Sequence, residues 1–134
     1  MKKEKSCGTI VVNSENKVLL VKHNKGHYGF PKGHMEKNES EVETATRETK
    51  EETNIDVVID ENKKYELSYN VSPNIDKTVI YFIASPKNIN IIPQESEIKE
   101  VLWIDIEEVT KYLQFANIIN LWNDKIIKDI KKQV

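Results

Sequence analysis

The sequence has almost no cysteine and no long apolar run. Cys7 is the only cysteine among 134 residues, so an internal disulfide is impossible. No apolar stretch approaches the ~18 residues that a membrane-spanning helix requires. The charged N-terminal residues also lack the apolar segment of a signal peptide. These absences exclude a disulfide framework and favour a cytoplasmic protein that does not contact membranes.

Excess charge of one sign is also lacking. The formal net charge is −2, from 20 basic and 22 acidic residues. Composition therefore gives no support for general binding to nucleic acid or to a membrane surface. The charged residues are mixed in sign, which is typical of a globular chain. The length suffices to bury a core without a structural metal, so we expect a single domain over residues 1–134.

Apolar patterning predicts an alternation of strands and helices. The predicted strands are 7–12, 18–21, 55–59, 65–71, 78–84 and 101–104. The polar segment 13–16 separates the first two, which we expect to form a hairpin. A turn-rich segment over 24–38 precedes a predicted helix over 40–53. This order predicts an α/β fold with a mixed β-sheet between helices.

Two further helices are predicted near the C-terminus. Asp105 is a candidate N-cap, and Glu108 three residues later completes a capping box for a short helix ending near Leu113. The last helix carries an apolar stripe that we expect to pack against the sheet. The stripe is formed by Ile118, Trp122, Ile126 and Ile130, and widened by Ile119 and Ile127.

Four charged residues cluster on one face of the helix over 40–53. A residue advances about 100° around a helix, so relative to Arg47, Glu51 falls at about 40°, Glu48 at about 100° and Glu52 at about 140°. Clustered carboxylates repel one another, and a divalent cation would reverse that cost. Hard oxygen ligands suit Mg²⁺ or Mn²⁺. Arg47 can orient a glutamate through a bidentate pair.

The same residues belong to a longer pattern. Gly33 begins the spacing G-x5-E-x7-R-E-x-x-E-E, which continues through Glu39 to Glu52. On this spacing the chain is identified as a member of the Nudix hydrolases. Thr49 replaces an aliphatic residue of the usual pattern and Asn54 replaces a glycine. Neither is a metal ligand, and asparagine is the next-best residue for a left-handed helix end.

The resemblance implies a Nudix α/β/α sandwich and Mg²⁺-dependent hydrolysis of a pyrophosphate bond. Glu48 and Glu52 would be the main metal ligands, assisted by Glu51 and the Gly33 carbonyl. Glu97 resembles a distal glutamate that joins the metal site or acts as base. Arg47 would belong to the catalytic set, and the base is left open among Glu51, Glu52 and Glu97.

Residues outside the box narrow the resemblance to the asymmetrically cleaving diadenosine tetraphosphate hydrolases. The segments 30–34 and 77–81, Glu97 before Trp103, and the dipeptide at 114–115 carry this likeness, which covers about residues 6–122. It implies water attack on a terminal-side phosphorus to give ATP and AMP. It also implies substrate contacts at His27, Lys32, His34, Tyr69, Lys77 and Tyr81.

Three alternatives remain open at this point. One is cleavage at the 5′ end of triphosphorylated RNA, although an RNA channel favours a basic, aromatic-lined groove and the lysines here are scattered. Another is cleavage of nucleoside triphosphates or sugar nucleotides. The third is a catalytically inactive Nudix-fold binding module, which the retained box glutamates disfavour.

Overall fold

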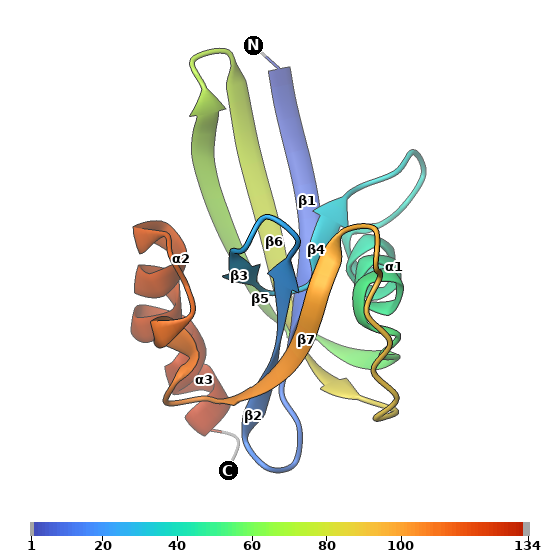
Figure 1. The fold of residues 1–134 in the computed structure, drawn as a ribbon. Helices are drawn as coiled ribbons and strands as arrows, with labels where there is room; N and C mark the ends of the chain where they lie inside the picture. Colours follow the sequence, from blue (N-terminus) through green and yellow to red (C-terminus); the bar gives the residue numbers. More distant parts are fainter. Residues whose placement is uncertain (1, 133–134) are drawn as a thin grey trace.

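The computed structural model describes residues 2–132, with strands, a helix, strands and further helices in that order (Figure 1). The strands are β1 (Lys2–Val11), β2 (Lys17–His23), β3 (Tyr28–Gly29), β4 (Lys32–His34), β5 (Val57–Ser72), β6 (Ile75–Pro86) and β7 (Ile98–Asp105). The helices are α1 (Glu41–Thr53), a 3₁₀ turn (Val109–Lys111), α2 (Ala116–Leu121), a π segment (Trp122–Ile126) and α3 (Ile127–Lys131). Within residues 2–132 no helix is long and apolar enough to cross a membrane.

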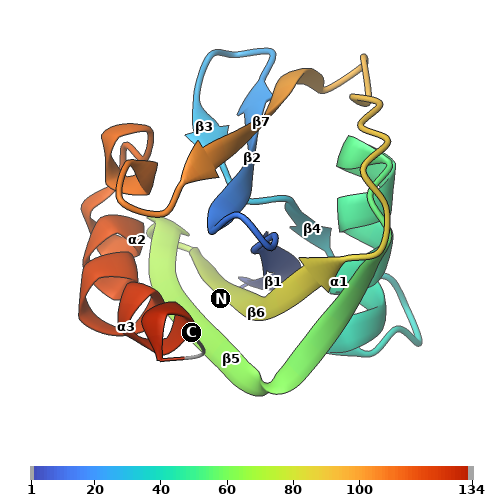
Figure 2. The same ribbon diagram turned by 90° about the horizontal axis from the view of Figure 1, so that it is seen from below.

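The strands form two sheets with helices on both sides. One sheet has the order β4-β1-β6-β5 and the other β3-β2-β7. β1 and β6 run parallel whereas the other pairs are antiparallel, so the larger sheet is mixed as predicted. Figures 1 and 2 show α1 on one side of the strands and α2 and α3 on the other. The α/β class with helices on two faces is confirmed.

The predicted hairpin between the first two strands is wrong. β1 and β2 lie in different sheets, and only an isolated bridge between Val12 and Val18 joins them. β6 pairs with β1 along one edge from Lys2 to Val11, and β4 pairs with the other edge. Both edges of β1 are thus occupied over Ser6 to Gly8, and β2 pairs with β3 and β7 instead. The strands predicted at 55–59 and 65–71 also merge into β5, whose pairing is irregular between Asp60 and Lys64.

Helix α1 begins and ends where the sequence predicts. Ser40 is the N-cap and forms a capping box with Glu43, and Asn54 ends the helix in the left-handed conformation with φ 67°. The small residues of the sheet-facing side are buried. Thr49 hydrogen-bonds the Thr9 hydroxyl of β1 at 2.6 Å, so the polar departure from the usual aliphatic has a buried partner.

The C-terminal segment packs against the sheet as predicted, but the segment that precedes it, from Asp105 to Leu113, differs from the prediction. Ile118, Trp122, Ile126 and Ile130 are buried in the main core, where Trp122 stacks on Phe30 with ring centroids 5.8 Å apart. The predicted capping box at Asp105 is wrong. Asp105 pairs with Lys17 at the end of β7, and its carbonyl accepts the Glu108 N–H at 2.8 Å in a turn. The expected helix is therefore reduced to a single 3₁₀ turn.

Candidate active site

Gly33 lies on β4 directly against the Glu48 carboxylate of α1. Pairing between β4 and β1 places Gly33 opposite Cys7. A Cβ at position 33 would lie 2.0 Å from Cδ of Glu48 and 2.1 Å from one carboxylate oxygen. The missing side chain at position 33 is therefore what allows Glu48 to approach the β4 backbone.

Arg47 organises the exposed side of the glutamate cluster. Its Nε and Nη2 donate to the two oxygens of Glu39 at 2.6 and 2.9 Å, and Nη1 donates to Glu48 at 2.7 Å. Nη2 also donates to the His34 carbonyl at 3.0 Å, and Nη1 lies 3.3 Å from both Glu51 oxygens. Hydrogen bonding to Arg47 lowers the pKa of Glu39 to about 2. The bidentate pair of Arg47 is therefore with Glu39, while Glu48 receives one bond, and Arg47 joins α1 to the loop that precedes it.

Glu52 is the most deeply buried carboxylate of the cluster. Only 2% of it is exposed, and its Oε1 accepts the Lys32 backbone N–H at 3.2 Å. Burial, followed by the charge of Glu48, raises the pKa of Glu52 to about 8. Burial also raises the pKa of Glu48. The protein thus holds two carboxylates side by side where their ionised forms are disfavoured, whereas Glu51 on the same helix is exposed.

Glu97 reaches this cluster from a different part of the chain. It is exposed on the turn before β7, and its charge contributes to the raised pKa values of both Glu48 and Glu52. Backbone bonds from Ile92 to the Thr53 carbonyl (3.0 Å) and from Gln94 to the Glu52 carbonyl (3.2 Å) hold this loop against the end of α1. The structure therefore brings the distal glutamate to the side of the box glutamates.

The donor set fits a hard divalent cation. Among residues 2–132 no three acidic, histidine or cysteine side chains converge as a ready-made metal cage. Mg²⁺ does not require one, because it keeps several waters and takes substrate phosphates as ligands beside one or two carboxylates. Glu48 and Glu52 supply two carboxylates, and a cation between them would offset the burial that chiefly raises their pKa values as well as the repulsion from neighbouring carboxylates.

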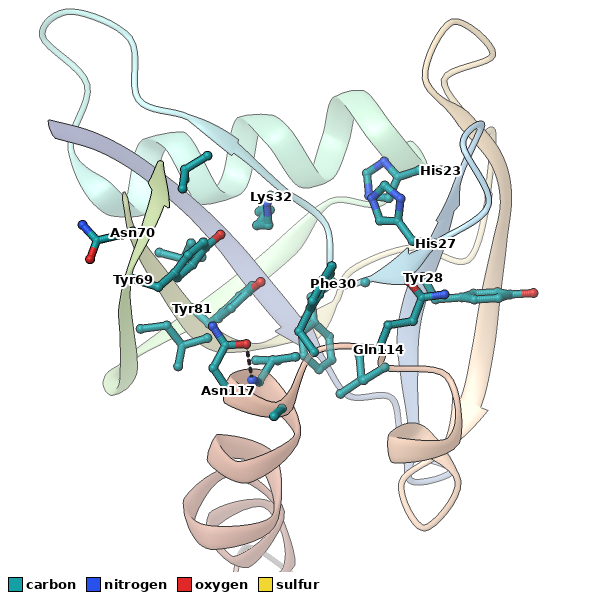
Figure 3. A pocket seen from close by; sticks show the side chains of 18 residues that line it. His23, His27, Tyr28, Phe30, Lys32, Tyr69, Asn70, Tyr81, Gln114 and Asn117 are labelled. Atoms are coloured by element: carbon teal, nitrogen blue, oxygen red, sulfur yellow. Dashed lines mark hydrogen bonds between the residues drawn. The ribbon is translucent and has the colours of Figure 1, made fainter. Parts of the chain in front are cut away.

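A cavity of about 590 Å³ opens beside Lys32 (Figure 3). Tyr69 and Tyr81 lie on one side of Lys32 and the pair His23 and His27 on the other. The two histidine rings are stacked with centroids 4.3 Å apart. Four of the predicted substrate residues line this cavity: His27, Lys32, Tyr69 and Tyr81.

The two tyrosines offer different surfaces to the cavity. Tyr69 is 41% exposed, so its ring face is accessible, whereas Tyr81 is only 4% exposed. Tyr81 packs edge-to-face on Phe30 with ring centroids 5.4 Å apart. Phe115, which is 64% exposed, also lines the cavity. Tyr69 and Phe115 are therefore the aromatic rings best placed to stack on a base.

His34 and Lys77 lie outside the cavity lining and contact each other. Lys77 is 6% exposed, and its Nζ donates to the Ser6 hydroxyl at 2.6 Å and lies 3.1 Å from His34 Nε2. Burial lowers the pKa of the Lys77 ammonium. The structure thus places these two predicted phosphate contacts in a separate cluster on β4, β1 and β6.

Sequence reasoning missed several cavity residues. Tyr28, Asn70, Val71 and Asn117 line the cavity but were not singled out. Tyr28 lies between Gly26 and Gly29, two residues before Phe30, and that aromatic pair inside a turn-rich segment was the available signal. Asn70 and Asn117 carry no motif, because only the fold brings β5 to the start of α2.

Comparison with known proteins agrees with this geometry. The family model of the NUDIX domain matches residues 2–128. The chain is 36% identical over 126 residues to the mouse asymmetrical bis(5′-nucleosyl)-tetraphosphatase, covering 83% of this chain and 85% of that protein. It is 28% identical to the RNA pyrophosphohydrolase of Pelagibacter ubique, covering 95% of this chain and 88% of that protein.

A solved structure gives the same result at the level of the fold. The C. elegans Ap4A hydrolase binary complex superposes with a TM-score of 0.79 at 27% identity, covering 90% of this chain and 93% of that chain. The family match spans nearly the whole chain and contains the complete glutamate pattern. The chain therefore belongs to the Nudix hydrolases, enzymes that act on pyrophosphate bonds.

Proposed function

We propose that this enzyme hydrolyses diadenosine tetraphosphate asymmetrically to ATP and AMP with Mg²⁺. The observation that carries the proposal is the position of Lys32. Its side chain lines the aromatic cavity, while its backbone N–H bonds the buried Glu52. One residue thus joins a base-sized aromatic cavity to the carboxylate cluster, as cleavage of a nucleoside polyphosphate requires.

The cavity residues divide into base and phosphate contacts. Tyr69 and Phe115 stack on an adenine at the exposed mouth of the cavity. Lys32 acts as a point charge toward the phosphates, and His27 donates a hydrogen bond. Tyr81 contributes its hydroxyl edge to the wall rather than a stacking face. The phosphate chain then extends past Lys32 toward Glu52.

The glutamate cluster carries the chemistry. Glu48 and Glu52 would hold the Mg²⁺, with Glu51, Glu97 and the Gly33 carbonyl as further candidate ligands. The chemistry that such an ion would supply there is neutralisation of phosphate-oxygen charge and a lowered pKa of a water. Arg47 keeps Glu48 in place through its 2.7 Å bond, and the base is one of Glu51, Glu52 and Glu97.

His34 and Lys77 would contact the phosphates as a pair. In the structure the Lys77 Nζ donates to Ser6 and lies beside His34, which is exposed. An ammonium has three N–H donors, so Lys77 can keep its bond to Ser6 and still donate to a polyphosphate. We therefore place these two residues at the far end of the phosphate chain from the aromatic cavity.

The second candidate function is removal of pyrophosphate from triphosphorylated RNA. The similarity to a bacterial RNA pyrophosphohydrolase supports it. Against it, the two exposed aromatic side chains within residues 2–132, Tyr69 and Phe115, line one cavity, whereas a strand-binding groove distributes its stacking platforms along a path.

A product-resolved assay separates the two functions. Purified protein is incubated with Mg²⁺ and a panel containing diadenosine tetraphosphate, nucleoside triphosphates, a sugar nucleotide and 5′-triphosphorylated RNA. We expect ATP and AMP in equal amounts from diadenosine tetraphosphate, with the highest kcat/KM of the panel. Release of two ADP contradicts the asymmetric assignment, and a higher kcat/KM on the RNA favours the second candidate.

A further inference from the structure

Asn24 lies on the turn between β2 and β3 and forms two hydrogen bonds with the turn that carries Glu97. Its backbone N–H donates to the Glu97 carbonyl at 2.9 Å. Its side-chain Nδ2 donates to the Glu95 carbonyl at 3.2 Å. The two bonds fix the carbonyl groups on either side of Ser96. The backbone orientation at Glu97 is therefore tied to Asn24.

A β-bulge between β2 and β7 directs the chain toward this contact. Lys22 lies opposite Glu100 and His23 opposite Ile98, so Lys99 is an extra residue on β7. Bulges of this kind occur beside functional sites, where they re-aim side chains. Here the bulge lies two residues after Glu97, and Asn24 directly follows the bulged pair on the partner strand.

The other side of the Glu97 turn is anchored to the catalytic helix. Gln94 N–H donates to the Glu52 carbonyl at 3.2 Å, and Gln94 in turn accepts the N–H groups of Glu97 and Ile98 at 3.0 and 2.7 Å. Glu97 therefore sits between two fixed points, Asn24 on one side and the end of α1 on the other. The Gln94 contacts set its distance from Glu52, and Asn24 sets its orientation.

We propose that Asn24 is a positioning residue that holds the Glu97 carboxylate toward the Glu48–Glu52 pair. This inference rests on the proposed function, in which Glu97 joins those carboxylates. Asn24 also lies on the turn closed by the 2.8 Å bond from His23 N–H to the His27 carbonyl. Both histidines line the cavity, so the two hydrogen bonds of Asn24 link the wall of that cavity to the turn that carries Glu97.

The test compares Asn24→Ala with Asn88→Ala in the full chain. Asn88 anchors the opposite end of the same loop, accepting the Asp56 N–H at 2.8 Å and donating to the Asn54 carbonyl at 3.2 Å. We expect Asn24→Ala to lower kcat about three- to tenfold and leave KM within about twofold, because misplaced catalytic groups act on the chemical step. Asn88→Ala should leave kcat within about twofold. Asn24→Ser also removes the side-chain bond, because the shorter side chain cannot reach the Glu95 carbonyl. If the alanine variant folds poorly, the serine variant replaces it and should show the same loss of kcat.

Two further readouts separate positioning from a general structural effect. In a Glu97→Gln background, Asn24→Ala should change kcat less than about twofold, since both changes disable the same group. Binding of Mn²⁺ alone, titrated calorimetrically, should weaken about threefold in Asn24→Ala and stay unchanged in Asn88→Ala. An undiminished effect in the Glu97→Gln background, or unchanged kcat in Asn24→Ala, overturns the inference.

The kinetic comparison uses whichever substrate of the panel the wild-type protein cleaves best. If that substrate is not diadenosine tetraphosphate, the substrate proposal fails while the Asn24 comparison still decides this inference. Turnover that does not depend on Asn24 refutes this inference alone. Absence of turnover on every substrate refutes both.

Discussion

Gly33→Ala is expected to lower kcat about a hundredfold while the protein stays folded. The new Cβ would lie 2.0 Å from Glu48 Cδ, and real Cβ atoms essentially never come within 3.0 Å of another heavy atom. The carboxylate must therefore move by at least about 1 Å, the difference between these two distances. A displacement of that size in a catalytic group can reduce the rate about a hundredfold, or ~2.7 kcal/mol of barrier.

The stability of this variant should change little. Gly33 does not have a positive φ, so alanine fits its backbone conformation and restricts the unfolded chain by about 0.4–1 kcal/mol in favour of folding. Moving Glu48 lengthens its 2.7 Å bond to Arg47, a partly buried pair whose loss costs about 1 kcal/mol. The net change in the free energy of unfolding should be within about 1 kcal/mol.

Steady-state kinetics on diadenosine tetraphosphate and thermal unfolding test this reasoning together. Gly29→Ala is the control for the thermal measurement, because a Cβ there meets no atom within 4 Å. A kcat within about threefold of wild type would show that the Glu48 position against Gly33 is not the one used in catalysis. A large fall in the melting temperature would show that the backbone, not Glu48, absorbs the strain.

Three other predictions address the same region. Glu52→Gln should abolish turnover without lowering thermal stability in metal-free buffer at pH 7, since a pKa of about 8 already keeps the buried carboxyl mostly neutral and the amide is neutral too; residual activity above about a hundredth of wild type would exclude Glu52 from the metal site. Thr49→Val should destabilise the protein by about 1–3 kcal/mol by leaving the buried Thr9 hydroxyl unpaired, and adding Thr9→Val should recover part of that loss in a denaturant-based double-mutant cycle. Burial, with the charges of His27 and Lys32, lowers the pKa of His23 from 6.5 to about 4. The unfolded chain therefore binds the extra proton first, so stability should fall as the pH drops from about 6.5 to 4. His23→Gln should flatten that part of a melting-temperature profile, and an unchanged slope would contradict the assignment.

Local pattern was enough to predict α1 and the face on which its glutamates lie. Ser40, Asn54 and the glutamate face follow from contacts three and four residues apart, which the helix geometry fixes in advance. The same holds for the apolar stripe that ends at Ile130. The spacing from Gly33 to Glu52 identified the family because all residues of the pattern lie in one continuous segment of loop and helix.

Long-range pairing decided what the sequence did not. The first two strands satisfy a hairpin pattern locally, yet β6 and β4 take both edges of β1. Likewise, Lys77 and Tyr81 lie four residues apart on one strand, and the sequence predicts both as substrate contacts. Their burial, however, depends on neighbours more than forty residues away, such as Ser6 and Phe30.

The sequence by itself determined that this chain is a Nudix hydrolase, because the pattern from Gly33 to Glu52 lies within one short segment. Only the tertiary structure decided how that segment is completed. It seats Glu48 on Gly33, holds the loop before Glu97 against α1 through Gln94 and builds the cavity from β5, β6 and α2. These contacts join residues far apart in the chain, and no local periodicity encodes their distances or directions.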